Sequence, residues 1–151
     1  MSFVRVSVHG GHSGSFCGHA VDPLAAVVAT YAEQGFEWIC LTEHMAPLRH
    51  AMIPPEERKD GMDVAAVQKR FTAYFAEARR LQSQWRGRMD ILVGFETEGY
   101  TGYESEVTEL INRHQPEMLV GSVHHIHDLL FDNKIEDYHR AAQISGGIEG
   151  L

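Results

Sequence analysis

The sequence has few cysteines, few basic residues and no long apolar run. Cys17 and Cys40 are the only cysteines among 151 residues, too few for a disulfide framework, which favours a reducing cytoplasm as the location. No apolar run approaches the roughly 20 residues that a membrane helix needs, and the first residues lack the pattern of a signal peptide. The 13 Lys and Arg residues against 21 Asp and Glu residues give a net charge of -8, which argues against general binding to nucleic-acid backbones.

Histidine, in contrast, is abundant. The chain contains 10 histidines beside its 21 acidic residues, a combination that suggests transition-metal binding. Hydrophobic residues make up 44% and charged residues 23% of the sequence, which are ordinary values for a globular protein. The length predicts one domain, residues 1–151, large enough to bury a sizeable core.

Strands and helices are expected to alternate along the chain. Apolar alternation and short apolar runs predict strands at residues 3–8, 36–41, 91–93 and 118–123. Helical spacing predicts helices at residues 22–34, 63–81, 105–113 and 135–144, the first two with Asp22 and Asp63 as N-caps. Residues 45–62 are expected to be irregular. The alternation favours parallel strands with helical crossovers, the α/β class.

Residues typical of metal sites fall where the expected strands end. His9 and His12 follow the first strand, and His44, Glu96 and His124 follow the other three. Ligand sites in parallel α/β folds lie at the carboxyl ends of strands, so we expect these side chains to meet at one edge. Each residue alone is weak support, because a single His or Glu past a strand is often only solvated.

Three segments carry this chemistry. The glycine-rich loop from His9 to His19 offers three imidazoles in eleven residues, and metal ligation is favoured over solvated histidines. The carboxylate of Glu96 could bridge two cations through its two oxygens, or could simply end a strand. In His124-His125-Ile126-His127, strand alternation points His125 away from His124 and His127. At most one or two of these three histidines should therefore bind a metal.

The order and spacing of these motifs resemble a known superfamily. The chain is similar to the N-terminal part of the PHP (polymerase and histidinol phosphatase) superfamily, and within it to the monofunctional histidinol-phosphatases. The resemblance rests on His12-Ser13-Gly14 to His19-Ala20, Asp22-Pro23-Leu24, Leu41-Thr42-Glu43-His44, Gly94-Phe95-Glu96 and Gly121-Ser122-Val123-His124-His125. It implies a distorted (β/α)7 barrel with up to three divalent metal ions, typically zinc, manganese or iron.

The resemblance also implies roles for individual residues. His9 and His12 correspond to the opening histidine pair, and His19 and His44 to ligands of a more separated metal. Glu96 corresponds to the bridging carboxylate and His124 to a ligand of the metal pair, which makes these two the expected catalytic residues. The implied reaction is hydrolysis of a small phosphomonoester, L-histidinol phosphate, in histidine biosynthesis, with no membrane or nucleic-acid partner. Arg49 is a candidate for binding the substrate phosphate. A surface role without substrate contact is equally favoured.

The sequence departs from the family pattern twice. Two residues separate His9 from His12 where the family has one, and we expect a loop bulge that lets His9 still reach the metal. The chain is also shorter than the roughly 250 residues of a barrel, so only the first four or so β/α units are expected, and later ligands are missing. Two alternatives therefore stay open: a PHP phosphoesterase for nucleotides or DNA 3′ ends, and a non-catalytic metal-binding module. An incomplete barrel would form a homo-oligomer or bind its missing half.

Overall fold

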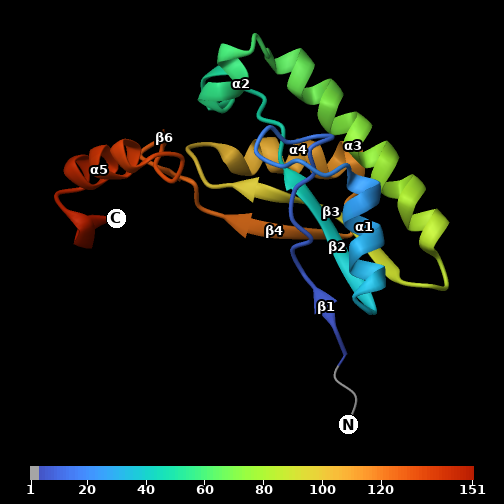
Figure 1. Ribbon diagram of the computed structural model, residues 1–151. Helices are drawn as coiled ribbons and strands as arrows, with labels where there is room; N and C mark the ends of the chain where they lie inside the picture. Colours follow the sequence, from blue (N-terminus) through green and yellow to red (C-terminus); the bar gives the residue numbers. More distant parts are fainter. Residues whose placement is uncertain (1–3) are drawn as a thin grey trace.

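The computed structural model describes residues 4–151, which form a parallel sheet with helical crossovers. The strands run in the order β1 (Val6–Ser7), β2 (Trp38–His44), β3 (Asp90–Glu98) and β4 (Met118–Ser122), and each pairs with the next in parallel. They are joined by α1 (Leu24–Glu33), α3 (Val64–Trp85) and α4 (Tyr103–His114), as Figure 1 shows. Neighbouring strands in chain order are the arrangement in which a β/α barrel begins. The predicted α/β class is confirmed.

Shorter elements follow β2 and β4. The segment after β2 contains a 3-10 turn η1 (His50–Met52) and α2 (Pro55–Lys59), where the sequence had predicted irregular structure. After β4 come the antiparallel pair β5 (His125–Ile126) and β6 (Leu129–Leu130), then α5 (Ile135–Ile144) and η2 (Ile148–Gly150). In Figure 1, α5 and β6 lie on the left beside the C-terminus, away from α1 and α3 on the right.

The core lies between the sheet and its crossover helices. Alternate residues of β2 and β3 face these helices, and they are Ile39, Leu41, Ile91, Val93 and Phe95. The apolar stripe of α3 packs on them through residues spaced three or four apart: Val67, Phe71, Tyr74, Phe75, Ala78 and Leu81. Because successive strand residues point to opposite faces, His44 and Glu96 project from the other face. The packed core thus fixes the strands that carry these polar residues.

The helix caps agree with expectation at one helix and not at another. The Asp63 side chain accepts a hydrogen bond of 2.8 Å from the Ala66 amide, so it caps α3 as predicted. Asp22 does not cap α1: the N-cap is Pro23, without a side-chain bond, and Ser15 Oγ accepts from the Leu24 amide instead. The backbone carbonyl of Asp22 accepts from Gly14, which holds the glycine-rich loop against the start of α1.

The first strand is shorter than expected. The alternation of Val4, Val6 and Val8 had predicted a strand over residues 3–8, but only two of these residues pair with β2. Phe3 lies outside the described residues. The three valines stay exposed because β1 is an edge strand in the described part of the chain. Within residues 4–151, no helix has the length and apolar character to cross a membrane.

Candidate metal centre

The carboxyl ends of the strands bring histidines and glutamates together in one cavity. In the parallel pairing of β2 and β3, His44 lies opposite Glu96, so both side chains leave the sheet on the same side. The loop after β1 adds His9 and His12, and the segment after β4 adds His124. A cavity of about 820 Å³ opens over these residues. The strand-end reasoning therefore predicted correctly which side chains would meet.

Glu96 lies at the centre of this group. Its carboxylate is almost fully buried, yet four imidazole nitrogens surround it. The distances to Oε2 are 3.2 Å from His12 Nε2 and 3.8 Å from His9 Nε2, and Oε1 is 3.6 Å from His124 Nε2. His44 Nδ1 lies 3.2 Å from Oε2. Tetrahedral ligand bonds of about 2.0–2.2 Å place neighbouring ligand atoms about 3.3–3.6 Å apart, so this spacing suits a shared divalent ion.

Three of these rings are oriented by a partner on their other nitrogen. His9 Nδ1 is hydrogen-bonded to Thr42 Oγ1 at 2.5 Å. His12 Nδ1 lies 3.4 Å from Glu43 Oε2, and His124 Nδ1 lies 3.2 Å from Glu98 Oε2. In each case Nε2 is left facing Glu96. A second-nitrogen contact of this kind fixes the tautomer and ring orientation of metal-binding histidines.

Glu43 and Glu98 were not among the predicted site residues. Both are buried, and each ties the centre to a different segment. Glu43 Oε1 accepts hydrogen bonds from the backbone amide and the hydroxyl of Ser13. Glu98 Oε1 accepts from His44 Nδ1 at 2.9 Å, and its Oε2 lies 3.6 Å from His125 Nδ1. The sequence offered one signal for them, which is their position at the same strand ends. Glu43 directly precedes His44, and Glu98 follows Glu96 by two residues.

The carboxylates and imidazoles shift one another's pKa values. Burial disfavours protonation of His12, but Glu43 and Glu96 outweigh it and raise its pKa to about 9. Contact with Glu98 raises the pKa of His124. Burial would raise the pKa of Glu98, yet His124, His125 and His44 hold it well below its usual range. Contacts with His12, His44 and His124 also outweigh burial and lower the pKa of Glu96, so the central carboxylate is ionised, as metal ligation requires.

Several buried polar atoms of this centre lack a hydrogen-bond partner among the described residues. Four of them face one another without hydrogen-bond geometry: His12 Nδ1 lies 3.4 Å from Glu43 Oε2, and His125 Nδ1 lies 3.6 Å from Glu98 Oε2. The other is Glu96 Oε2, which faces the imidazoles of the centre, and because buried polar atoms are normally satisfied, it indicates a missing partner there. A divalent cation fits, because nitrogen and carboxylate donors in this number are the usual ligands of zinc and related ions.

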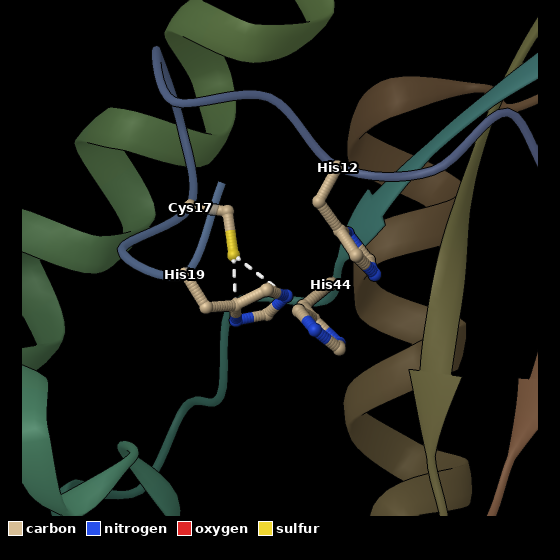
Figure 2. Close-up of side chains that lie close together, drawn as sticks. All are labelled: His12, Cys17, His19 and His44. Atoms are coloured by element: carbon tan, nitrogen blue, oxygen red, sulfur yellow. Dashed lines mark hydrogen bonds between the residues drawn. The ribbon is translucent and has the colours of Figure 1, made fainter. Parts of the chain in front are cut away.

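A second group of ligand atoms adjoins the first. Atoms from His12, Cys17, His19 and His44 all lie within 4.8 Å of one another (Figure 2). The rings of His12 and His44 stack with centroids 4.0 Å apart, and His19 packs edge-on against both. Burial and the neighbouring imidazoles lower the pKa of His19. The structure thus gathers all six predicted metal ligands, though their ligation remains a prediction.

The unusual spacing of the first two histidines has a steric cause. The Gly10 amide bonds to the Cys40 carbonyl, and a side chain at position 10 would meet that oxygen at 2.4 Å. A histidine two residues before His12 therefore has no room. Gly11, with φ of 77°, turns the chain in the left-handed region between His9 and His12. With this turn, His9 Nε2 lies 3.8 Å from Glu96 Oε2, and its ligation of a metal stays a prediction.

Comparison with known proteins identifies the fold that carries this centre. A family model described as the PHP domain matches residues 10–150. The chain belongs to the PHP domain family. A probable histidinol-phosphatase of Schizosaccharomyces pombe is 34% identical over 142 residues, which are 93% of this chain and 45% of that protein. The histidinol-phosphatase of Saccharomyces cerevisiae is 27% identical over 135 residues, which are 82% of this chain and 40% of that protein.

Solved structures show the same fold. A crystal structure from Listeria monocytogenes, provisionally named a histidinol phosphatase, gives a TM-score of 0.75 at 21% identity, covering 97% of this chain and 55% of that one. A second crystal structure is of a histidinol phosphate phosphatase of Lactococcus lactis in complex with zinc, L-histidinol and phosphate. It gives a TM-score of 0.58 at 21% identity and covers 97% of this chain and 54% of that one. This PHP domain spans about half the length of the relatives it matches.

Other predicted residues of the PHP domain lie at the rim or outside the cavity. Arg49 pairs with Glu106 through Nε at 2.7 Å and also contacts the Thr101 carbonyl and the Tyr100 ring. It does not line the cavity, whereas three other arginines do: Arg58, Arg70 and Arg140. Asp132, in the bend before α5, lies 3.9 Å from His124 Nε2.

Proposed function

We propose that this PHP domain supplies the metal-binding part of a phosphomonoesterase that hydrolyses L-histidinol phosphate to L-histidinol and phosphate. The observation that carries the proposal is the buried Glu96 carboxylate with four imidazoles around it, in a chain of the PHP family. Relatives named histidinol-phosphatases, and a neighbour named as holding zinc, L-histidinol and phosphate, support the choice of substrate and metal. Manganese and iron are the alternatives to zinc.

The residues of the centre divide into ligands and supports. His9, His12, Glu96 and His124 would hold a metal pair, and His19 with His44 a third ion. Metals bound there would polarise the phosphoryl oxygens and lower the pKa of the attacking water. Glu43 and Glu98 orient imidazoles, and Glu96 presents its two oxygens to two sides of the centre. The cavity arginines Arg58, Arg70 and Arg140 add positive charge for the phosphate.

Phosphate release from L-histidinol phosphate by metal-reconstituted protein tests the proposal. We expect turnover with zinc or manganese and none in Glu96→Ala, because the central carboxylate is lost. Glu109→Ala on the exposed face of α4 is the matched control and should keep wild-type activity. Absence of turnover in metal-loaded wild type would contradict the proposal for the chain alone. Turnover of nucleotides instead would reassign the substrate.

The remaining expectations concern the setting of the domain. Its extent over residues 1–151, its cytoplasmic location and its association with a second copy or a missing half stay predictions. The chain spans 45% and 40% of the length of the two sequence relatives.

A further inference from the structure

Cys17 lies beside the histidines and has no role in the function proposed so far. Its Sγ is 3.1 Å from Nδ1 and 3.3 Å from Nε2 of His19, and Figure 2 shows the sulfur pointing at that ring. The side chain is nearly buried, and the imidazoles of His12 and His44 complete the same cluster. Ligand atoms of three histidines therefore lie within 4.8 Å of the sulfur.

The backbone holds Cys17 in this place. Its amide bonds to the Ser13 carbonyl at 2.8 Å, closing a tight turn. Ser13 is in turn tied to the Glu43 carboxylate through two hydrogen bonds. Phe16, the preceding residue, packs edge-on against Tyr74 in the core. The sulfur is therefore fixed relative to β2, which also carries His44.

The distances suit coordination by a tetrahedral ion. Bonds of about 2.3 Å to sulfur and 2.0–2.1 Å to nitrogen place neighbouring ligand atoms about 3.3–3.6 Å apart. The contact of Cys17 with His19 is close to this range, and the remaining atoms lie within 4.8 Å. Glu98 occupies Nδ1 of His44, which leaves its Nε2 for this cluster.

We infer that Cys17 is a metal ligand, forming with His19 and His44 a sulfur-containing subsite beside the Glu96 centre. On binding, the thiol proton leaves to solvent and the sulfur lone pair bonds to the metal. A thiolate favours zinc or cobalt over manganese, so the subsite should make the domain selective for softer ions. This inference rests on the metal binding in the proposed function and not on phosphatase turnover.

Cobalt absorption tests the inference, because only a bound sulfur gives an intense sulfur-to-cobalt charge-transfer band in the near ultraviolet. We expect the band in cobalt-loaded wild type and its loss in Cys17→Ala and Cys17→Ser. Cys40→Ala is the matched control: Cys40 is the other buried free cysteine, and its Sγ lies by the Leu41 carbonyl. It should keep the band. Zinc affinity should fall at least about tenfold in the Cys17 variants.

The outcomes separate the two proposals. Cobalt binding without the band in wild type, or a band that persists in Cys17→Ala, overturns the inference even if phosphatase activity is present. A sulfur band without turnover supports the subsite and counts against the proposed function. A wild-type chain that takes up no cobalt overturns both. Circular dichroism of each variant, with Cys17→Ser as the closer isostere, shows that loss of the band does not come from unfolding.

Discussion

At the scale of single residues, the centre depends on carboxylates that do not face a metal themselves. Glu98 is the clearest case, because one buried side chain contacts the Nδ1 atoms of His44, His124 and His125. Glu43 plays the same part for His12 and also anchors the glycine-rich loop through Ser13. Each acid fixes which nitrogen of its histidine is free. The affinity of the centre should therefore respond to these acids as well as to the ligands.

Replacing Glu98 tests this dependence. We expect Glu98→Gln to weaken zinc binding by about 10- to 100-fold, because the side chain loses its negative charge and one of the two acceptor oxygens that orient the imidazoles. Competition with a chromophoric chelator measures the affinity. Glu104→Gln, at an exposed position in the first turn of α4, is the control and should bind zinc as wild type does. Unchanged zinc affinity in Glu98→Gln would show that the contact is only structural.

The sequence could identify the candidate ligands but not their supports. His9, His12, His44, Glu96 and His124 were recognisable because each follows a strand and the type of residue suits a metal. Glu98 was harder to identify, since an acid at the end of a buried strand is often exposed. Its role depends on His44 in β2 and on His124 and His125 after β4, which lie 26 or more positions away along the chain and which only the tertiary fold brings together.

At the scale of elements, the approach of the first loop to β2 decides where His9 and His12 lie. Gly10 bonds to Cys40 across this gap, and its missing side chain makes the approach possible. We expect Gly10→Ala to lower the free energy of unfolding by about 1–3 kcal/mol, because the added methyl meets a backbone oxygen. Urea denaturation measures the change. Gly18→Ala in the same loop should be close to neutral, since its Cβ would meet nothing within 4 Å; equal losses in both variants would argue against this account.

The start of β4 is tied to the neighbouring elements by one carboxylate. Glu117 Oε2 accepts from the Val93 amide at 2.8 Å and Gln82 Nε2 at 2.7 Å, and it pairs with Arg79. Burial works against ionisation of Glu117, but these donors lower its pKa below the usual 4.5. A lowered folded-state pKa means that the stabilisation is present above pH 4.5 and is lost as the pH falls through the folded-state value.

The substitution Glu117→Gln therefore has a pH-dependent effect. We expect it to cost about 1 kcal/mol at pH 7, a value kept small because the side chain is more than a third exposed. The cost should shrink below pH 4.5. Thermal unfolding of both proteins across this pH range measures it. Glu109→Gln, which removes an exposed pair within α4, should show little effect at any pH. If the loss of stability in Glu117→Gln grew as the pH fell, the stabilising role of the ionised Glu117 carboxylate would be refuted.

Local sequence patterns predicted most helices and strands but missed the short hairpin after β4. Asp63 marked the start of α3 because a side-chain cap is visible in the sequence. The hairpin of β5 and β6 was not expected: its turn residues, His127 and Asp128, both have positive φ without the usual Asn-Gly or Asp-Gly signal. Asp128 is held there by accepting from the Thr101 amide, a contact 27 residues away that no local pattern encodes.

At the scale of the whole molecule, the proposed metal binding would link distant segments. The candidate ligands come from the loop after β1, from β2, from β3 and from the segment after β4. An ion held between them would crosslink the sheet from one side to the other. It would also offset part of the net charge of -8.

Zinc should therefore stabilise the folded chain. At a free concentration 100 times the dissociation constant, we expect the free energy of unfolding to rise by about 2.7 kcal/mol. Scanning calorimetry with and without zinc should show a higher Tm, reversed by a chelator. In Glu96→Ala the increase should be much smaller. An unchanged Tm for wild type at saturating zinc would mean that binding does not couple to folding.

The barrel itself was predictable only in part. Alternating strand and helix signals predicted four β/α units, and the described chain has four parallel strands in that order. Nothing local states how many units a complete barrel needs or which later residues would complete the metal centre. The match covers 97% of this chain but only 55% and 54% of the two structural neighbours, so the local signals of this chain describe only the shared part of the fold.

The most direct test of the central claim is anomalous diffraction at the zinc edge from crystals of the zinc-loaded chain. The account predicts an anomalous peak within about 2.0–2.2 Å of a Glu96 carboxylate oxygen and of Nε2 of a neighbouring histidine, His12 or His124. It also predicts that Glu43 and Glu98 remain on the far nitrogens of the rings. Zinc bound only at surface histidines, with Glu96 still surrounded by unligated imidazoles, would contradict it.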